Sequence, residues 1–94
     1  MNLEQIIKKK SGTIVDVRTP DEFRCGNVQG SVNVPLQDLQ QRLNEVRKLQ
    51  TPLVLCCASG GRSTIATQFL SSLGIECLDG GSWLNVNYYT SQTT

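Results

Sequence analysis

Cys57 is the residue of this sequence best placed for covalent chemistry. It follows a continuous apolar run, residues 52–56, and begins a short glycine-rich loop that leads into a helical pattern. A loop of this kind, between a buried strand and a helix, points several backbone N–H groups inward and forms a nest for an anion. We therefore predict that Cys57 is a thiolate nucleophile rather than an incidental cysteine in a tight turn.

The chain contains no histidine, which limits how Cys57 is activated. Ser/His/Asp triads, Cys/His dyads and His-bearing zinc sites are all excluded. A thiol with the usual pKa of about 8.5 is only ~3% thiolate at pH 7, and a depression of two units raises that share to roughly 75%. The shift needs about 2.7 kcal/mol. One or two charge-assisted hydrogen bonds of about 1.5–3 kcal/mol each, with a helix N-terminus, can supply it.

Arg62 lies five positions after Cys57, in the first turn of the expected helix. A cation there opposes the helix macrodipole, so it is a poor choice for helix stability alone. We expect Arg62 to face a bound anion and to help lower the pKa of Cys57.

The other three cysteines are predicted to have ordinary roles. Cys56 and Cys77 lie in apolar strand patterns and are expected to be core residues. Cys25 ends a helical pattern beside a glycine and is expected to be exposed, with a chemical role as the lesser alternative. The chain has no C-x-x-C pair, so we expect no metal site.

Strand patterns alternate with helical patterns along the chain. The expected helices are residues 2–10, 19–25, 36–46 and 65–73, and the expected strands are residues 13–17, 31–34, 52–56 and 75–78. This alternation predicts an α/β fold, a small parallel β-sheet flanked by helices on both faces. Ligands of such sheets bind beyond the carboxyl ends of the strands, where Cys57 lies.

Length and composition set the class of protein. The 94 residues predict a single domain over 1–94, with a core of about 13–84, an element opened by Trp83 that the pattern does not classify, and a frayed tail over 88–94. The formal charge is +1 and the basic residues are scattered apart from Lys8, Lys9 and Lys10, so no nucleic-acid partner is expected. The longest apolar run, residues 53–58, is far short of the roughly 18 residues of a membrane span.

The cellular setting is inferred from the start of the sequence. Residues 1–5 lack the charged and apolar regions of a secretory signal, so we expect a cytoplasmic protein, with no membrane partner and with free thiols. The sequence also fits a mature exported chain to which a starting methionine was added.

Four segments carry a family pattern. They are residues 14–23 (IVDVRTPDEF), 26–36 (GNVQGSVNVPL), 57–63 (CASGGRS) and 79–81 (DGG). In this order they resemble the single-domain rhodanese family of sulfurtransferases. The resemblance implies that Cys57 accepts sulfane sulfur as a persulfide held by the backbone amides of residues 58–62. The implied catalytic residues are Cys57 and Arg62, and the implied substrate-binding residues are Ala58, Ser59, Gly60, Gly61 and Ser63.

The expected reaction moves sulfane sulfur from thiosulfate or a persulfide donor to cyanide or a thiol acceptor. It needs no metal or organic cofactor, and a protein persulfide is a further candidate donor or acceptor. Ala58 stands where the family often has a basic residue, so we expect thiosulfate, a dianion, to be a mediocre donor. Asp16 and Arg18 are expected to be scaffold residues, paired with each other or with Glu22.

Two alternatives remain at this stage. Cysteine phosphatases and arsenate reductases also join a thiolate and an arginine in one loop, but their C-x-x-x-x-x-R pattern is one residue longer than the interval from Cys57 to Arg62. A non-catalytic rhodanese-like interaction domain is the other alternative, and the intact Cys57 argues against it.

Overall fold

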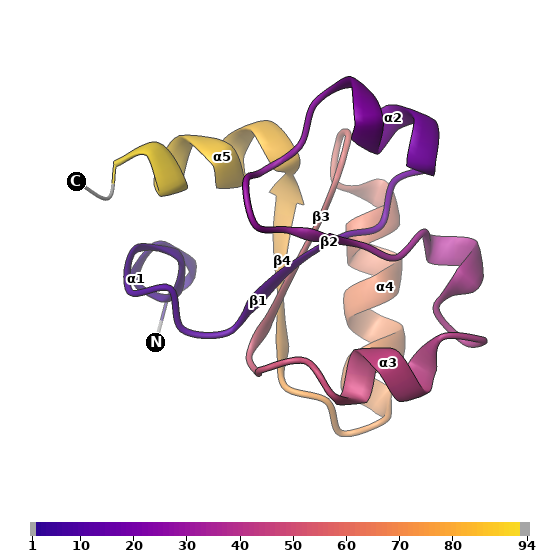
Figure 1. Ribbon diagram of the computed structural model, residues 1–94. Helices are drawn as coiled ribbons and strands as arrows, with labels where there is room; N and C mark the ends of the chain where they lie inside the picture. The colour runs from indigo at the N-terminus through magenta and orange to yellow at the C-terminus, as the bar shows by residue number, and fades with distance from the viewer. Residues whose placement is uncertain (1, 93–94) are drawn as a thin grey trace.

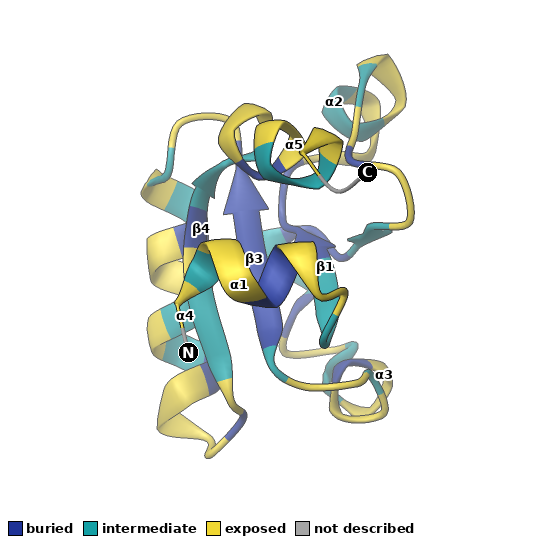
Figure 2. Cartoon of the chain, turned by 90° about the vertical axis from the view of Figure 1, so that its left-hand side faces the viewer, coloured by how far each residue is buried: buried dark blue, intermediate teal, exposed yellow. Residues whose placement is uncertain are grey.

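Four short parallel strands form the centre of the structure, a computed structural model that describes residues 2–92 (Figure 1). They are β1 (Thr13–Asp16), β2 (Val32–Asn33), β3 (Leu53–Cys57) and β4 (Cys77–Ser82), in the order β2-β1-β3-β4. All five residues of β3 are buried (Figure 2). A strand covered on both faces needs apolar side chains at every position, which explains why its sequence shows no alternation.

Helices cover both faces of this sheet, as predicted. They are α1 (Leu3–Lys8), α2 (Pro20–Cys25), the 3₁₀ helix η1 (Leu36–Asp38), α3 (Leu43–Arg47), α4 (Gly61–Ser72) and α5 (Trp83–Ser91). α3, α4 and η1 lie on one face, and α1 and α5 lie together on the other (Figure 1). None of the helices within residues 2–92 is long and apolar enough to cross a bilayer.

The side chains of β3 divide between two cores. Leu53, Leu55 and Cys57 belong to the cluster under α3 and α4, whereas Val54 and Cys56 belong to the cluster under α1 and α5. This alternation follows from the period of two in a β-strand. The two adjacent cysteines are therefore directed to opposite faces of the sheet.

The predicted start of α2 is confirmed in detail. The Thr19 hydroxyl accepts the Glu22 N–H at 3.3 Å, and the Glu22 carboxylate accepts the Thr19 N–H at 3.0 Å. Pro20 occupies the first helical position. The capping box and the proline together fix where α2 begins.

The prediction of a single helix over residues 36–46 is wrong. The chain forms η1, a turn, and then α3, which begins only at Leu43. Arg42 leaves the helical region, with φ −103° and ψ 21°, and its guanidinium donates to the Asn33 carbonyl at 3.3 Å. Buried Leu39 and Val46 pack into the same core from separate turns, so tertiary packing overrides the helical period.

Two expectations near the end of the chain also need correction. The last strand begins at Cys77 rather than at residue 75, and it continues through the paired glycines to Ser82. The unclassified element at Trp83 is α5, which Ser82 caps by accepting the Leu84 N–H at 3.2 Å. Positions 88–91 of the expected frayed tail are helical because Tyr89 packs against the core under α1 and α5; positions 93 and 94 lie outside the described residues.

Candidate active site

Cys57 is the last residue of β3, at the end of the sheet where α2 also lies (Figure 1). Ala58, Ser59 and Gly60 connect it to α4, and Gly60 has φ 108°, a left-handed conformation that glycine adopts without strain. The turn directs two backbone N–H groups at the sulfur. Gly60 N lies 3.0 Å and Ser63 N lies 3.3 Å from Cys57 Sγ.

These donors favour the thiolate form of Cys57. Burial raises the pKa of the thiol, but donors around the sulfur outweigh it and hold the pKa below its usual value. The Ser63 hydroxyl would lower the pKa of the thiol most if it turned to the sulfur, but in the structure it donates to Asp79 Oδ1 at 2.7 Å and to the Gly60 carbonyl at 3.0 Å. The donors directed at the sulfur are the backbone N–H groups of Ser63, Gly60 and Ser59. A sulfur held in this way can act as a nucleophile without a histidine.

Arg62 is engaged differently from the expectation. Its guanidinium forms a two-pronged ion pair with Glu22 of α2, with Nη1–Oε1 2.6 Å and Nη2–Oε2 2.9 Å. This contact raises the pKa of Arg62 first, and the charge of Cys57 raises it further. Because the coupling is reciprocal, Arg62 favours the thiolate, but from a position in which Glu22 already balances its charge.

Glu22 therefore has two roles, one within α2 and one between distant segments. Besides completing the capping box with Thr19, it holds Arg62 across 40 residues of sequence. The hydrogen bond from Arg62, followed by the one from the Thr19 backbone, lowers the pKa of Glu22 to about 2. The carboxylate is thus ionised at neutral pH and joins α2 to the loop of Cys57.

A buried ion pair fixes α2 in turn. The Arg18 guanidinium contacts both carboxylate oxygens of Asp16, with Nη2–Oδ2 at 2.7 Å, and it also donates to the backbone carbonyls of Glu22 and Gly26. Trp83 covers it, with the guanidinium carbon 4.6 Å from the ring centroid. The expectation that Asp16 pairs with Arg18 is confirmed, and the pair positions the helix that carries Glu22.

Asp79 is a contact of the loop that the sequence alone did not suggest. Its carboxylate lies 2.7 Å from the Ser63 hydroxyl and 2.6 Å from the Thr64 hydroxyl, both in the first turn of α4. It also accepts the Gly81 N–H at 2.9 Å. The only signal in the sequence is its place before the paired glycines, which gives no indication of the partner.

The remaining cysteines differ from Cys57 in their surroundings. Cys56 is fully buried, and burial, followed by the nearby Asp16 charge, raises its pKa to about 12. Cys25 is exposed, as predicted. Cys77 is half-buried rather than a full core residue, because its sulfur contacts the Ser71 hydroxyl at 3.2 Å near the surface.

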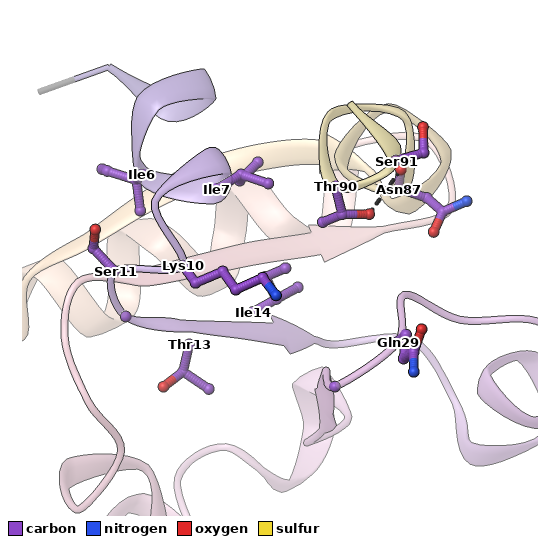
Figure 3. A pocket seen from close by; sticks show the side chains of 12 residues that line it. Ile6, Ile7, Lys10, Ser11, Thr13, Ile14, Gln29, Asn87, Thr90 and Ser91 are labelled. Carbon is purple, nitrogen blue, oxygen red and sulfur yellow. Dashed lines mark hydrogen bonds between the residues drawn. The ribbon is translucent and has the colours of Figure 1, made fainter. Parts of the chain in front are cut away.

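A cavity of about 700 Å³ lies elsewhere, between α1, α5 and β1 (Figure 3). Ile6, Ile7 and Ile14 line it, and the Lys10 side chain extends across it. None of residues 57–63 lines this cavity. It is therefore separate from the cysteine loop.

Comparisons with known proteins agree with this architecture. A family model described as Rhodanese-like domain matches residues 2–83. The uncharacterized protein YqhL of Bacillus subtilis is 40% identical over 75 residues, covering 77% of this chain and 59% of that protein. Thiosulfate sulfurtransferase GlpE of Shewanella oneidensis is 32% identical over 90 residues, covering 90% of this chain and 88% of that protein. A rhodanese-related protein from Thermoplasma volcanium has a solved structure that superimposes with a TM-score of 0.75 at 30% identity, covering 86% of this chain and 80% of that one.

Proposed function

This chain belongs to the rhodanese-like domain family, and on that premise we propose that it is a sulfurtransferase that carries sulfane sulfur on Cys57. One observation carries the proposal. The sulfur of Cys57 accepts N–H groups from Gly60 and Ser63 in a loop that lowers the pKa of the thiol. The chain spans 59% of the Bacillus subtilis relative, so the proposal concerns the activity of this domain.

The first half-reaction loads the cysteine. The Cys57 thiolate attacks the outer sulfur of the donor, a new S–S bond forms, and the donor's own bond to that sulfur breaks. The leaving group departs with the electron pair, as sulfite from thiosulfate or as a thiolate from a persulfide. We assign the loop residues Ala58, Ser59, Gly60, Gly61 and Ser63 to hold the transferred sulfur.

The second half-reaction unloads it. A thiolate acceptor or cyanide attacks the terminal sulfur of the Cys57 persulfide, and the S–S bond to Cys57 breaks. The acceptor leaves as a persulfide or as thiocyanate, and Cys57 returns to the thiolate. In each displacement one bond to the transferred sulfur forms, another breaks, and the leaving group keeps the electron pair. The proposed cycle therefore needs no external oxidant or reductant, and neither a metal nor an organic cofactor.

The charges around the loop favour a persulfide donor over thiosulfate. Glu22 balances Arg62, Ala58 contributes no charge, and Asp79 places a carboxylate beside the first turn of α4. A dianion finds no unpaired cation among these loop residues, whereas a persulfide carries a single negative charge. We therefore propose a low-mass or protein persulfide as the preferred donor.

Phosphatase chemistry fits the same loop less well. A tetrahedral oxyanion needs several donors at once, with the arginine among them. Here only four residues separate Cys57 from Arg62, and the guanidinium is directed to Glu22. Arsenate reduction makes the same demand on Arg62.

Mass spectrometry of the intact protein tests the proposal. Incubation with thiosulfate, or with glutathione persulfide in a parallel sample, should add the mass of one sulfur atom to the wild type. Cys57→Ser should gain none, while Cys25→Ser, which removes an exposed thiol, should gain the same mass as the wild type.

Three outcomes would overturn this assignment. Added sulfur that persists in Cys57→Ser would place the reaction on another cysteine. No added sulfur from either donor in the wild type would favour a non-catalytic interaction domain, and Cys57-dependent hydrolysis of aryl phosphates faster than sulfur transfer would favour a phosphatase.

A further inference from the structure

Asp79 brings a carboxylate to the first turn of α4 and directly precedes an irregularity in the sheet. The register between β3 and β4 shifts so that Leu55 pairs with Asp79 and Cys56 pairs with Gly81, leaving Gly80 as an extra residue. Asp79 itself keeps the regular register with Leu55 and, two residues after Cys77, lies on the strand face that packs against α4. A side chain at Gly80 would lie 2.8 Å from Val86, so the bulge requires glycine there.

The Ser63 hydroxyl has one proton and more than one acceptor. Asp79 Oδ1 lies 2.7 Å and the Gly60 carbonyl 3.0 Å from Ser63 Oγ, and the same residue's backbone N–H already contacts Cys57 Sγ. Ser63 is fully buried, so water does not take up the excess acceptors. An ionised carboxylate is the strongest of the oxygen acceptors, and hydrogen bonds to it are about twice as strong as neutral ones.

Asp79 is ionised at neutral pH. Burial raises its pKa, but hydrogen bonds from Thr64, Ser63 and the Gly81 backbone outweigh burial and hold the pKa below its usual value. Thr64 occupies the second oxygen at 2.6 Å. Each carboxylate oxygen therefore holds one hydroxyl of α4.

We infer that Asp79 is a positioning residue that competes with Cys57 for the proton of the Ser63 hydroxyl and keeps that proton from the sulfur. The sulfur is then held by backbone amides alone. A thiolate or persulfide with one fewer hydrogen bond is the more reactive nucleophile, because nucleophilicity falls as a thiol becomes more acidic. Asp79 thus sets the balance between a populated thiolate and a reactive one. This consequence for sulfur transfer rests on the proposed function.

Other charged groups face Cys57 and must be kept in place during a test. The charged pair near Cys57 is Arg62 on α4 with its partner Glu22 on α2. On the opposite face of β3 lie the neutral thiol of Cys56 and the Asp16–Arg18 pair. None of them is changed by substitutions at positions 63, 64 or 79. Effects of such substitutions can therefore be assigned to the Ser63 hydroxyl or to the Asp79 charge.

The experiment is a titration of Cys57 in the free protein, followed by thiolate absorbance in a background with Cys25 and Cys77 replaced by serine. Asp79→Asn keeps the shape but turns the acceptor into a group that can donate to Ser63 Oγ, which frees the hydroxyl proton for its remaining acceptors, the sulfur and the Gly60 carbonyl. The midpoint should fall by about one pKa unit, the size expected of one hydrogen bond. The acidic limb of the pH–rate profile of sulfur transfer should shift to lower pH by the same amount.

Three further variants separate the causes. Ser63→Ala alone should move the midpoint by less than about 0.3 units, because the hydroxyl does not serve the sulfur while Asp79 is ionised. Asp79→Asn in the Ser63→Ala background should lose most of its effect. Thr64→Ala removes the other hydroxyl held by Asp79 and should leave the midpoint of the Cys57 titration unchanged. If Asp79 acted only by holding α4 in place, Thr64→Ala would shift that midpoint as well.

The inference is overturned by any of three results. The midpoint does not fall in Asp79→Asn, or it falls equally in the Ser63→Ala background, which would make the effect a simple charge effect. The third is a rise of about one unit in Ser63→Ala alone, which would place the hydroxyl proton on the sulfur from the start. The titration uses the unloaded protein, so it decides the role of Asp79 even if no persulfide forms on Cys57.

Discussion

Cys56 and Cys57 are neighbours in sequence and are both buried, yet their thiols have opposite acid–base behaviour. Cys57 is 1% exposed and Cys56 is 0% exposed, so the exposed fraction alone does not separate the two thiols. The pKa of Cys57 lies below the usual value, whereas burial and the Asp16 charge raise the pKa of Cys56 to about 12. The alternation of β3 sends one sulfur toward the amides of the loop and the other into the apolar cluster under α1 and α5.

The comparison shows what a buried thiolate requires. Taking a charge out of water is costly unless donors replace the water. At Cys57 the backbone N–H groups of Gly60 and Ser63 do so, and they belong to a turn that the glycines make available. At Cys56 the nearest full charges are the carboxylate of Asp16 and the guanidinium that Asp16 already binds.

The largest expected effect is the difference in alkylation rate between the two cysteines. At pH 7 a thiol with a pKa of about 12 is ~10⁻⁵ thiolate, and one with a pKa below 9 exceeds about 1%, so Cys57 should react at least about a thousand times faster. Iodoacetamide labelling of Cys56→Ala and Cys57→Ala, read by mass spectrometry, measures the two rates. Labelling of Cys56 within tenfold of Cys57 would contradict the comparison.

The next effect concerns the ion pair behind Cys56. Asp16→Ala leaves the Arg18 charge buried without its partner, so the free energy of unfolding should fall by about 3–5 kcal/mol. The matched control is Asp21→Ala, which breaks the exposed pair of Asp21 and Arg24 and should cost less than about 1 kcal/mol. Urea unfolding of both variants measures the difference. Equal losses of unfolding free energy in the two variants would show that the buried pair stabilises the fold no more than the exposed pair does.

A smaller effect is expected from adding charge on the Cys57 side. Ala58→Lys supplies the loop with a cation that Glu22 does not balance, worth about 1 kcal/mol near the surface, so the KM for thiosulfate should fall about fivefold. The gain should shrink as salt is added. Ala58→Gln, of similar length without the charge, is the control. An unchanged KM for Ala58→Lys at low ionic strength would mean that residue 58 does not face the donor.

The smallest effect is a dependence of stability on acid. The pKa of Glu22 is lowered from 4.5 to about 2, so its ion pair stabilises the fold above about pH 4.5, and this contribution disappears as the pH falls through 2. The difference in unfolding free energy between wild type and Glu22→Gln should therefore be constant above pH 4.5, narrow below it and vanish near pH 2. Arg62→Ala should show the same dependence. If the difference in unfolding free energy between wild type and Glu22→Gln does not change between pH 6 and pH 2, the Glu22–Arg62 ion pair is not the source of the stabilisation.

Local chemistry explains which parts of the structure the sequence could predict. The start of α2 follows from residues within four positions of one another, Thr19 to Glu22. The turn from Cys57 into α4 follows from the glycines that it contains. The period of three and four over residues 36–46 misled because the same spacing is met by two separate turns that pack into one core.

Contacts between distant segments explain what the sequence could not predict. Arg62 and Glu22 are 40 residues apart, and Ser63 and Asp79 are 16 apart. Each pair depends on how α2 and β4 are placed against α4, and no local pattern encodes that placement. The position of Arg62 in the first turn of the helix indicated that it faces an anion. Its ion-pair partner, Glu22, could not be predicted from the sequence.

The two edges of the sheet bear on how the molecule behaves when copies meet. An exposed strand edge is a template for pairing with another chain, and natural sheets blunt such edges with short strands and bulges. β2, at one edge, has two residues, and β4, at the other, carries the bulge at Gly80. Neither edge offers a long regular row of free N–H and C=O groups, so the irregularity directly after Asp79 also discourages self-association through strand pairing.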